Sequence, residues 1–250
     1  MNETMIILVT GANKGIGRQI AAQLGALGHS VVVGARTAEL GQKAAAELRE
    51  GGADATSVRL DVTDPDSAAA AAAAIEARYG RLDALVNNAG ISFPPGSDLG
   101  DQRPSGADLD VLRAVFETNY FGVITVTNAM LPPLRRSPSP RIVNVSSSVG
   151  SLNVNADPKG ADGPPLMPVS AGYVTSKTAL TALTLQYAWD LLAEGIKVNA
   201  VCPGYVATDL NGHRGHRTPA EGAVAAVRMA TVGPDGPTGA FTDDKGPVPW

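Results

Sequence analysis

The fold is decided by the stretch Thr10-Gly11-Ala12-Asn13-Lys14-Gly15-Ile16-Gly17. It follows a short apolar run, Ile6–Thr10, that predicts a β-strand, and it opens a segment, Gly17–Leu27, that predicts a helix. Glycines at such a turn let the backbone approach a pyrophosphate, whose charge is met by the free N–H groups and dipole of the helix N-terminus. The glycine spacing differs from the common dinucleotide fingerprint, and a glycine-rich turn alone can also be an ordinary tight connection.

Outward from this turn, β-branched runs alternate with alanine-rich helical segments, which is the pattern of repeated βαβ units. The predicted strands are Ile6–Thr10, Ser30–Ala35, Ser57–Asp61, Ala84–Asn87, Arg141–Ser146 and Lys197–Val201, with a weaker seventh near Ala240–Thr242. The predicted helices are Gly17–Leu27, Ala38–Glu50, Pro65–Tyr79, Asp108–Leu131, Ala171–Ala193 and Pro219–Thr231. The expected fold is therefore α/β, a doubly wound, Rossmann-like parallel sheet of about seven strands with helices on both faces.

The chain has 250 residues and no internal linker, so we expect residues 1–250 to form a single dinucleotide-binding and catalytic domain. Loop insertions are expected near residues 92–106 and 151–170, where Gly, Pro, Ser and charged residues interrupt the alternation. A shorter loop is expected at His213–Thr218.

The net charge of −4 and the absence of a Lys/Arg-rich run argue against nucleic acid or an anionic membrane as a partner, which favours small molecules. The apolar run Met5–Val9 is too short for a membrane span and lacks the basic start of a signal peptide, so a cytoplasmic location is expected. The single cysteine, Cys202, excludes an intramolecular disulfide and is expected to be a small buried hydrophobe. The three His residues show no zinc-ligand spacing, so no metal is expected.

Further motifs follow the glycine-rich turn in a specific order. They are Asn87-Asn88-Ala89-Gly90 closing the fourth predicted strand, Asn119, Ser147, Tyr173-Val174-Thr175-Ser176-Lys177, and Pro203-Gly204 after the sixth strand. With Thr10–Gly17, these motifs resemble the short-chain dehydrogenase/reductase family nearly from end to end, and specifically its carbonyl reductase branch. The closing stretch, Gly236–Trp250, also resembles the end of carbonyl reductases.

The pair Tyr173 and Lys177 can be read from physical chemistry alone. Residues spaced i, i+4 on a helix lie on one face and can meet. Lowering the pKa of a phenol from about 10 to about 7 requires roughly 4 kcal/mol, and a cation about 5 Å away at an effective dielectric of about 20 supplies roughly 3 kcal/mol. We therefore expect Lys177 to lower the pKa of Tyr173, the proton donor, with a positive nicotinamide adding the rest. An exposed Tyr/Lys pair on a helix surface is the competing interpretation.

Two polar residues complete the expected catalytic set. Ser147 ends the fifth predicted strand, where its hydroxyl can donate to a substrate carbonyl oxygen, although Ser146 and Ser148 are chemically equivalent neighbours. The resemblance selects Ser147. It also implies that Asn119 holds a water that links the lysine to bulk solvent, whereas a helix kink or a surface polar site would equally explain an Asn in a long helix.

The cofactor preference depends on the residues after the second strand. An enzyme of this fold that uses NAD places an acid there, whereas an Arg accommodates the 2′-phosphate of NADP. Ala35 and then Arg36 occupy this position, and the resemblance places Lys14 beside the same phosphate, so NADP is expected. A solvated surface Arg is the alternative. Asn87 is predicted to border the cofactor from its strand end. The resemblance implies further cofactor contacts from Gly11, Asn13, Gly15, Ile16, Gly17, Asp61, Val62, Asn88, Ala89, Gly90, Tyr173, Lys177, Pro203, Gly204, Val206 and Thr208.

Together these expectations describe an NADPH-dependent oxidoreductase that transfers hydride to a ketone or aldehyde, or catalyses the reverse alcohol oxidation. One alternative is a nucleotide-binding regulator that has lost catalysis, but Asn119, Ser147, Tyr173 and Lys177 are all competent residue types. Another is an epimerase or dehydratase that uses the same Tyr–Lys pair with tightly held NAD, which the cations Arg36 and Lys14 disfavour.

The substrate is expected to be small and apolar or aromatic. Its pocket is expected to draw on Phe93, Pro94, Pro95, Leu166, Met167, Tyr205 and Trp250, although each could instead pack its own loop. The stretch between Ser147 and Tyr173 is longer than in typical oligomeric family members and shorter than in monomeric carbonyl reductases. The oligomeric state stays open between the two, with a monomer as the expectation.

The serine run gives a direct test of the motif register. If Ser147 holds the substrate carbonyl, Ser147→Ala lowers the rate of NADPH-dependent turnover, while Ser148→Ala leaves it nearly unchanged. Steady-state kinetics of the two variants measure this. A loss of turnover in Ser148→Ala alone would show that the register is wrong by one residue.

Overall fold

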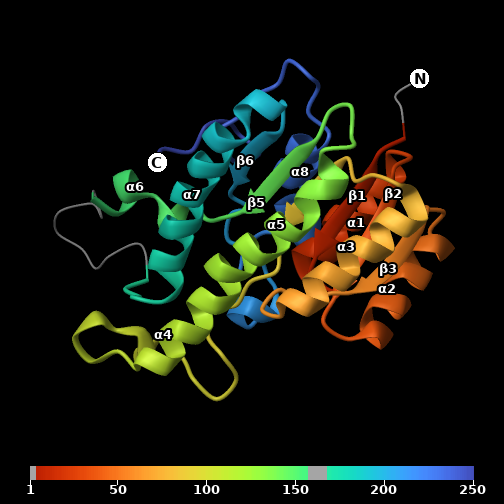
Figure 1. Cartoon of the computed structure of the whole chain (residues 1–250). Helices are drawn as coiled ribbons and strands as arrows, with labels where there is room; N and C mark the ends of the chain where they lie inside the picture. Colours follow the sequence, from red (N-terminus) through yellow and green to blue (C-terminus); the bar gives the residue numbers. More distant parts are fainter. Residues whose placement is uncertain (1–3, 157–167) are drawn as a thin grey trace.

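A computed structural model describes residues 4–156 and 168–250, and at their centre lies one seven-stranded sheet in the order β3-β2-β1-β4-β5-β6-β7 (Figure 1). All neighbouring strands pair in parallel. The strands are β1 Ile6–Thr10, β2 Ser30–Ala35, β3 Ala55–Arg59, β4 Ala84–Asn87, β5 Arg141–Val145, β6 Lys197–Val201 and β7 Phe241–Thr242. The predicted Rossmann-like fold class is therefore confirmed.

Helices cover both faces of this sheet (Figure 1). They are α1 Gly15–Ala26, α2 Ala38–Glu50, α3 Pro65–Tyr79, α4 Leu109–Phe116, α5 Gly122–Leu134, α6 Leu152–Ala156, α7 Tyr173–Asp190 and α8 Pro219–Ala230. The apolar cluster on one face contains residues of α1, α2 and α8, and the cluster on the other contains residues of α3, α5 and α7. None of the helices in residues 4–156 and 168–250 is long and apolar enough to cross a membrane.

The strands are apolar on both sides because both faces of the sheet are covered. In β1, Ile7 and Val9 belong to the cluster with α1, α2 and α8, while Leu8 between them belongs to the opposite cluster. β2 repeats this alternation with Val31 and Val33 on one face and Val32 on the other. Side chains that alternate along a strand thus hold two helical layers to one sheet.

The structure corrects several predicted boundaries. β3 ends at Arg59 and β5 at Val145, so Asp61 and Ser146 lie beyond their strands. The long predicted helix Asp108–Leu131 is divided by a π-helical turn, Glu117–Phe121, between α4 and α5. The predicted loop 151–170 begins with the short helix α6.

The order of the sheet positions the candidate site. Successive strands run outward in one direction from β1 to β3 and in the other from β4 to β7, so the direction reverses between β1 and β4. In open α/β sheets, ligands bind at such a reversal, outside the carboxyl ends of the strands. The loops that follow β1, β2, β4, β5 and β6 meet at this edge because the strands are parallel, and these loops contain most of the predicted site residues.

Candidate active site

The loop between β1 and α1 is shaped for close backbone approach. Gly11 and Gly15 adopt φ values of +62° and +56°, a left-handed region that favours glycine. A Cβ on Gly17 would lie 2.4 Å from the side-chain nitrogen of Asn88 and 2.6 Å from the backbone oxygen of Gly11. Side chains at these positions would fill the turn, so the loop fits the phosphate cradle that the sequence predicts.

Asn88 joins this glycine loop to the end of β4. Its side-chain amide donates to the backbone oxygen of Thr10 at 2.8 Å, and the Thr10 hydroxyl accepts from the backbone N–H groups of Asn88 and Ala89 at 3.0 and 2.9 Å. A Cβ on Gly11 would lie 3.1 Å from the Cα of Ala89. The predicted contacts Asn88 and Ala89 therefore lie against the glycine loop.

The expectation for Asn87 is wrong. Its side chain is buried and donates to the Thr127 hydroxyl at 3.1 Å and to the Asn144 carbonyl at 2.9 Å. Alternation along β4 turns Asn87 into the helical layer below the sheet edge, while the next residue turns toward the glycine loop.

The loop after β6 reaches the glycine loop from the other side. The methyl group of Thr208 lies 3.6 Å from the position that a Cβ on Gly15 would occupy. Next to it, Asp209 accepts a hydrogen bond from the Lys14 ammonium at 2.7 Å and contacts His213 at 2.9 Å. The hydrogen bond from Lys14 is the main reason that the pKa of Asp209 is lowered. Asp209 is a site neighbour that the sequence analysis did not identify, because its partner lies on a distant loop.

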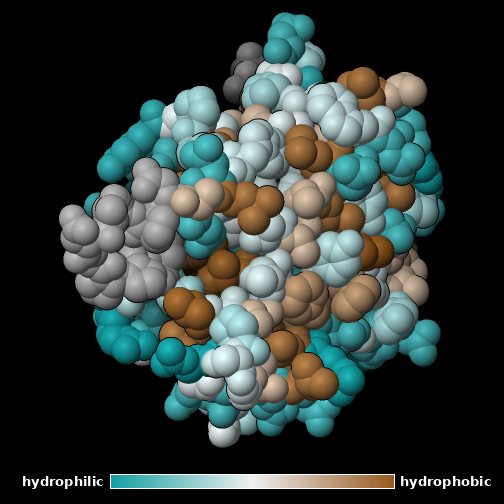
Figure 2. Space-filling view, turned by 90° about the vertical axis from the view of Figure 1, so that its left-hand side faces the viewer, coloured by the Kyte–Doolittle hydropathy of each residue, from teal (hydrophilic) through white to brown (hydrophobic). Residues whose placement is uncertain are grey.

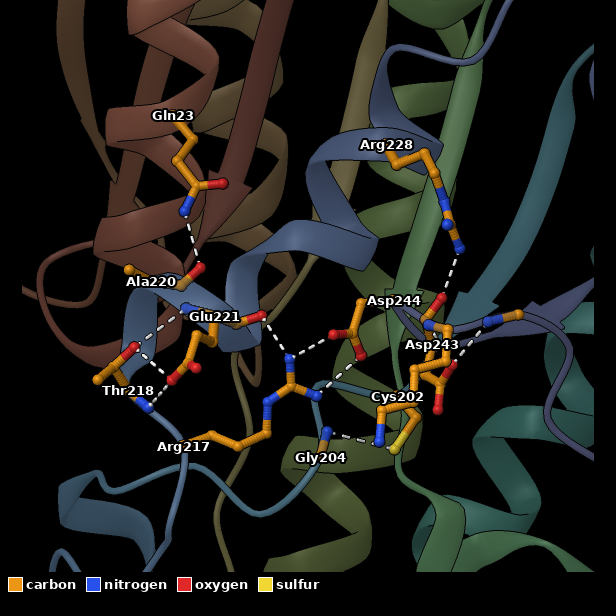
Figure 3. A network of polar contacts seen from close by, with 12 residues as sticks. Gln23, Cys202, Gly204, Arg217, Thr218, Ala220, Glu221, Arg228, Asp243 and Asp244 are labelled. Atoms are coloured by element: carbon orange, nitrogen blue, oxygen red, sulfur yellow. Dashed lines mark hydrogen bonds and ion pairs between the residues drawn. The ribbon is translucent and has the colours of Figure 1, made fainter.

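An ion pair holds the base of this β6 loop (Figure 3). The Arg217 guanidinium donates to both carboxylate oxygens of Asp244, at 2.8 and 2.7 Å, and to the backbone oxygen of Glu221 at 3.1 Å. Gly204 has a φ of +77°, and a Cβ there would lie 2.8 Å from the Cδ of Arg217. Val206, another predicted contact, is buried and pairs with Arg217 in an isolated β-bridge. The turn after Pro203 therefore packs against the Arg217 side chain, whose guanidinium is held by Asp244.

Cys202 has a more specific place than the sequence analysis expects. It is buried, as predicted, but its sulfur accepts a hydrogen bond from the backbone N–H of Gly204 at 3.4 Å (Figure 3). It also accepts from the backbone N–H of Ser148 at 3.2 Å. The thiol thus joins the loop after β5 to the loop after β6. Nothing in the sequence separates such a sulfur from an ordinary apolar cysteine.

Tyr173 and Lys177 meet as their spacing predicts. Tyr173 is the first residue of α7, and the Lys177 ammonium lies 5.9 Å from the centroid of its ring. Lys177 is buried and donates to the backbone oxygen of Val145, the last residue of β5, at 2.9 Å. The Ser147 hydroxyl lies beside the Tyr173 phenol, where it acts to lower the pKa of that phenol. The structure thereby brings Ser147, Tyr173 and Lys177 together at the carboxyl end of β5.

The pKa values run against the sequence-based expectation. Burial raises the pKa of Tyr173 to about 12, the nearby Cys202 adds to the rise, and the hydrogen bond with Ser147 opposes it. Burial also lowers the pKa of Lys177 to about 8, against an opposing effect of Cys202. The prediction that Lys177 lowers the pKa of the Tyr173 phenol toward neutral pH is therefore wrong for this structure. It omitted desolvation, which disfavours the charged form of both groups.

The three serines after β5 are distinguished by their surroundings. The Ser146 hydroxyl is buried against α7, where it contacts the Thr181 hydroxyl at 2.7 Å and donates to the backbone oxygen of Lys177 at 3.2 Å. Ser147 is only half-buried and is the serine beside the Tyr173 phenol. Ser148 is tied through its backbone N–H to Cys202. This arrangement supports the register chosen from the sequence.

Asn119 lies at the centre of the π-helical turn and is buried. Its side-chain oxygen accepts from the Ile91 N–H at 2.9 Å, and its nitrogen donates to the Ile91 backbone oxygen at 2.9 Å and to the Ser176 hydroxyl at 3.0 Å. A Cβ on Gly90 would lie 3.2 Å from the Asn119 oxygen and 3.5 Å from the Lys177 nitrogen. The helix is thus irregular at Asn119, which agrees with the alternative of a helix kink. Asn119 also lies near Lys177, as the expected link from Lys177 through a water to solvent requires.

The remaining predicted cofactor contacts follow neighbouring strands. Arg36 is exposed and lies two residues beyond Gly34, which pairs with Thr10 at the start of the glycine loop. Asp61 follows β3, and its carboxylate accepts from the Thr63 N–H and hydroxyl at 3.0 and 2.8 Å. Arg36 and Asp61 therefore lie on the side of the glycine loop where the adenosine end of a dinucleotide is expected.

The face that carries α4, α6 and α7 mixes apolar and hydrophilic side chains (Figure 2). Leu109 and Phe121 are exposed there and help to line a groove of 410 Å³ along α4, which includes none of the predicted catalytic residues. Tyr205 is exposed in the β6 loop, and Trp250 contacts Phe241 with ring centroids 5.8 Å apart. The predicted wall residues Leu166 and Met167 lie outside the described residues.

No group of three or more His, Cys, Asp or Glu side chains in the described part of the chain is placed to hold a metal ion. The residues at the sheet edge fit a dinucleotide instead, because Gly11 and Gly17 have little or no space for a Cβ and the Lys14 ammonium lies beside the turn.

The lowered pKa of Lys177 predicts how stability depends on pH. Between pH 8 and its ordinary value of 10.5, Lys177 is neutral in the folded protein and charged in the unfolded chain. The unfolded chain then binds more protons, so the free energy of unfolding rises with pH, by up to about 3 kcal/mol from this group. Denaturant titrations across this range should show the rise in the wild type and in a control, Lys43→Met, on the exposed side of α2. An undiminished rise in Lys177→Met would contradict the assignment.

Comparison with known proteins places this geometry in a family. The model of the short chain dehydrogenase family matches residues 5–218. Salutaridine reductase of Papaver bracteatum is 36% identical over 294 residues, covering 94% of this chain and 93% of the relative. Carbonyl reductase (NADPH) 1 of Mus musculus is 34% identical over 281 residues, covering 98% of both chains.

Solved structures give the same result. The structure of salutaridine reductase from Papaver somniferum matches with a TM-score of 0.79 and 31% sequence identity, covering 96% of this chain and 99% of that one. Both the family model and the curated relatives span most of the chain. The chain belongs to the short-chain dehydrogenase/reductase family of nicotinamide-dependent oxidoreductases.

Proposed function

We propose that the protein is an NADPH-dependent carbonyl reductase, which reduces a ketone or aldehyde to an alcohol. The observation that carries the proposal is the group at the end of β5, where the Ser147 hydroxyl lies beside the Tyr173 phenol and Lys177 lies one helical turn below. This group lies at the sheet edge that the glycine loop also forms.

Each residue has a distinct part in reduction. The bound nicotinamide supplies the hydride to the carbonyl carbon. The Ser147 hydroxyl donates a hydrogen bond to the carbonyl oxygen and orients it, and the Tyr173 phenol gives that oxygen its proton. Because the pKa of Tyr173 is raised to about 12, the phenol holds a proton at neutral pH. Lys177, with a pKa of about 8, is mostly charged at pH 7 and stabilises the phenolate that forms.

Arg36 and Lys14 support a preference for NADPH. Arg36 stands where an acid would accept from the ribose 2′-hydroxyl of NADH. Lys14 is paired with Asp209, but both side chains are more than half exposed, so water screens the pair and a phosphate can compete for the ammonium. The relative from Mus musculus carries NADPH in its name, which agrees with this preference.

We propose a small apolar substrate. Two exposed rings are available for it, Tyr205 on the β6 loop and Trp250, which packs on buried Phe241 at the end of the sheet. The backbone oxygen of Trp250 accepts from Asn153 N–H at 2.8 Å and from the Ser151 hydroxyl at 3.1 Å, which joins Trp250 to the segment after Ser147.

The proposed function is tested by incubating the protein and NADPH with a panel of ketones and aldehydes. The expected result is a steady loss of NADPH absorbance with members of the panel. Clear NADPH binding with no turnover of any of them would support a non-catalytic binding protein instead.

Tyr173→Phe should abolish turnover while NADPH binding stays within about twofold of the wild type. General acid catalysis contributes roughly 10² to 10⁴ in rate, and the substitution removes only one hydroxyl. Steady-state kinetics and a fluorescence titration with NADPH measure the two effects. A variant that retains more than about a tenth of the wild-type kcat would remove Tyr173 from the mechanism.

The cofactor preference should be reversible. The wild type should prefer NADPH by about tenfold to a few hundredfold in kcat/KM, because only NADPH has a 2′-phosphate that can bind Arg36 and compete with Asp209 for Lys14. The double variant Ala35→Asp, Arg36→Gln should prefer NADH, since the new carboxylate accepts from the ribose hydroxyl and repels the phosphate. Lys43→Gln on α2 makes the same charge change as Arg36→Gln at a distance and should keep the original preference. Equal use of NADH by the wild type would leave Arg36 as a solvated surface residue.

A further inference from the structure

We propose that Gln102 is a positioning residue for Tyr173. Gln102 ends a single 3₁₀ turn, Gly100–Gln102, in the long segment between β4 and α4, and it is fully buried. Its side chain reaches α7 at the residue that carries the phenol, 71 positions further along the chain. The inference rests on the proposed function, since it assigns a role in holding the proton donor of that reaction.

Both ends of the Gln102 amide are used. Its side-chain oxygen accepts from the Tyr173 backbone N–H at 2.7 Å and from the Ser170 hydroxyl at 2.6 Å. Its side-chain nitrogen donates to the backbone oxygen of Ser92 at 2.7 Å, and its own backbone oxygen accepts from the Ala171 N–H at 2.8 Å. A single buried residue thus binds both the segment before α7 and the segment after β4.

The start of α7 needs such an external partner. The first N–H groups of a helix have no partner within the helix, and Ser, Thr, Asp or Asn at the N-cap usually satisfies one of them. Gly172 occupies the N-cap of α7 and has no side chain to offer. The Gln102 carbonyl, together with the Ser170 hydroxyl at 2.8 Å, accepts the Tyr173 N–H instead.

Gly172 is also what lets Gln102 approach. A Cβ at this position would lie 2.3 Å from the Gln102 side-chain oxygen. The backbone of Gly172 has a φ of −96°, so glycine is not needed there for its conformation. The absence of a side chain at residue 172 therefore serves the contact with Gln102.

Gln102 and Asn119 form a two-part brace. Asn119 bonds to Ile91 and to Ser176, and Gln102 bonds to the next residue, Ser92, and to Tyr173. Tyr173 and Ser176 are spaced i, i+3 and so lie on one face of the first turn of α7. Two buried side-chain amides thereby fix the first turn of α7 to the segment that follows β4.

The brace matters for rate because proton transfer depends on placement. Displacing a catalytic group by about 1 Å can cost about 10²-fold. Gln102→Met keeps the side-chain length but removes all three hydrogen bonds of the side-chain amide. We expect it to lower kcat about tenfold or more and to leave KM for NADPH within about twofold, because Gln102 bonds to the backbone of Tyr173 and to Ser92, Ser170 and Ala171, and none of its hydrogen bonds reaches the glycine loop. Gln23→Met, which removes an exposed hydrogen bond from a side-chain amide to the backbone oxygen of Ala220, is the matched control and should leave kcat unchanged.

A double-mutant cycle separates positioning from general loss of structure. Gly172→Ala should lower kcat as Gln102→Met does, because the new Cβ displaces the Gln102 carbonyl. In a Gln102→Ala background the same change should cost no more than about twofold, since the clash with Gln102 is gone and only the flexible end of Leu112, 3.1 Å from the new Cβ, must shift. Additive losses of kcat in the two backgrounds would overturn the proposal, as would a kcat within about twofold of the wild type in Gln102→Met. Should Gln102→Met fail to fold, Gly172→Ala gives the decisive comparison.

Amide hydrogen exchange of residues 171–177 provides a readout independent of activity. Exchange should be faster in Gln102→Met and in Gly172→Ala than in the wild type and Gln23→Met. If the wild type binds NADPH but reduces no carbonyl, the proposed function fails while faster exchange still shows that Gln102 anchors α7. Unchanged exchange in both variants would refute the anchoring itself.

Discussion

The site depends on the buried polar contact between α7 and β5. Asn144 donates to the Thr184 hydroxyl at 2.9 Å, Ser146 contacts Thr181 at 2.7 Å, and the Lys177 ammonium donates to the Val145 carbonyl at 2.9 Å. Leaving one buried partner of this kind unsatisfied costs about 1–3 kcal/mol, so sliding α7 along β5 would break several such bonds together. A purely apolar interface would fix the distance between helix and strand but not their relative register.

This register brings the proposed catalytic groups together. Ser147 lies at the carboxyl end of β5, and Tyr173 and Lys177 lie on one face of the first turns of α7. Burial then favours the neutral form of both titratable groups, with the pKa of Tyr173 near 12 and that of Lys177 near 8. This state suits the proposed proton donation, because the phenol is protonated and the lysine can carry charge at neutral pH. Binding of a charged cofactor changes this balance further.

The sequence predicted the fold and the meeting of Tyr173 with Lys177, because both depend on short-range patterns. Alternating apolar runs identified the strands of the parallel sheet, and the i, i+4 spacing identified the Tyr173–Lys177 pair. The failures have a common cause in contacts between distant segments. Nothing near Gln102 or Cys202 in the sequence indicates that they bind α7 or join two loops. The pKa of Tyr173 was predicted in the wrong direction because desolvation depends on the packed structure, whereas the attraction of a neighbouring cation can be read from spacing.

The central claim is that hydride reaches a carbonyl beside Tyr173. Its most direct measurement is transfer of deuterium from NADPH in which both hydrogens of the reactive nicotinamide carbon are replaced by deuterium, followed by mass spectrometry of the product. The account predicts an alcohol with one deuterium on the former carbonyl carbon, formed by the wild type and nearly absent with Tyr173→Phe. An alcohol without deuterium, or equal transfer by the Tyr173→Phe variant, would contradict it.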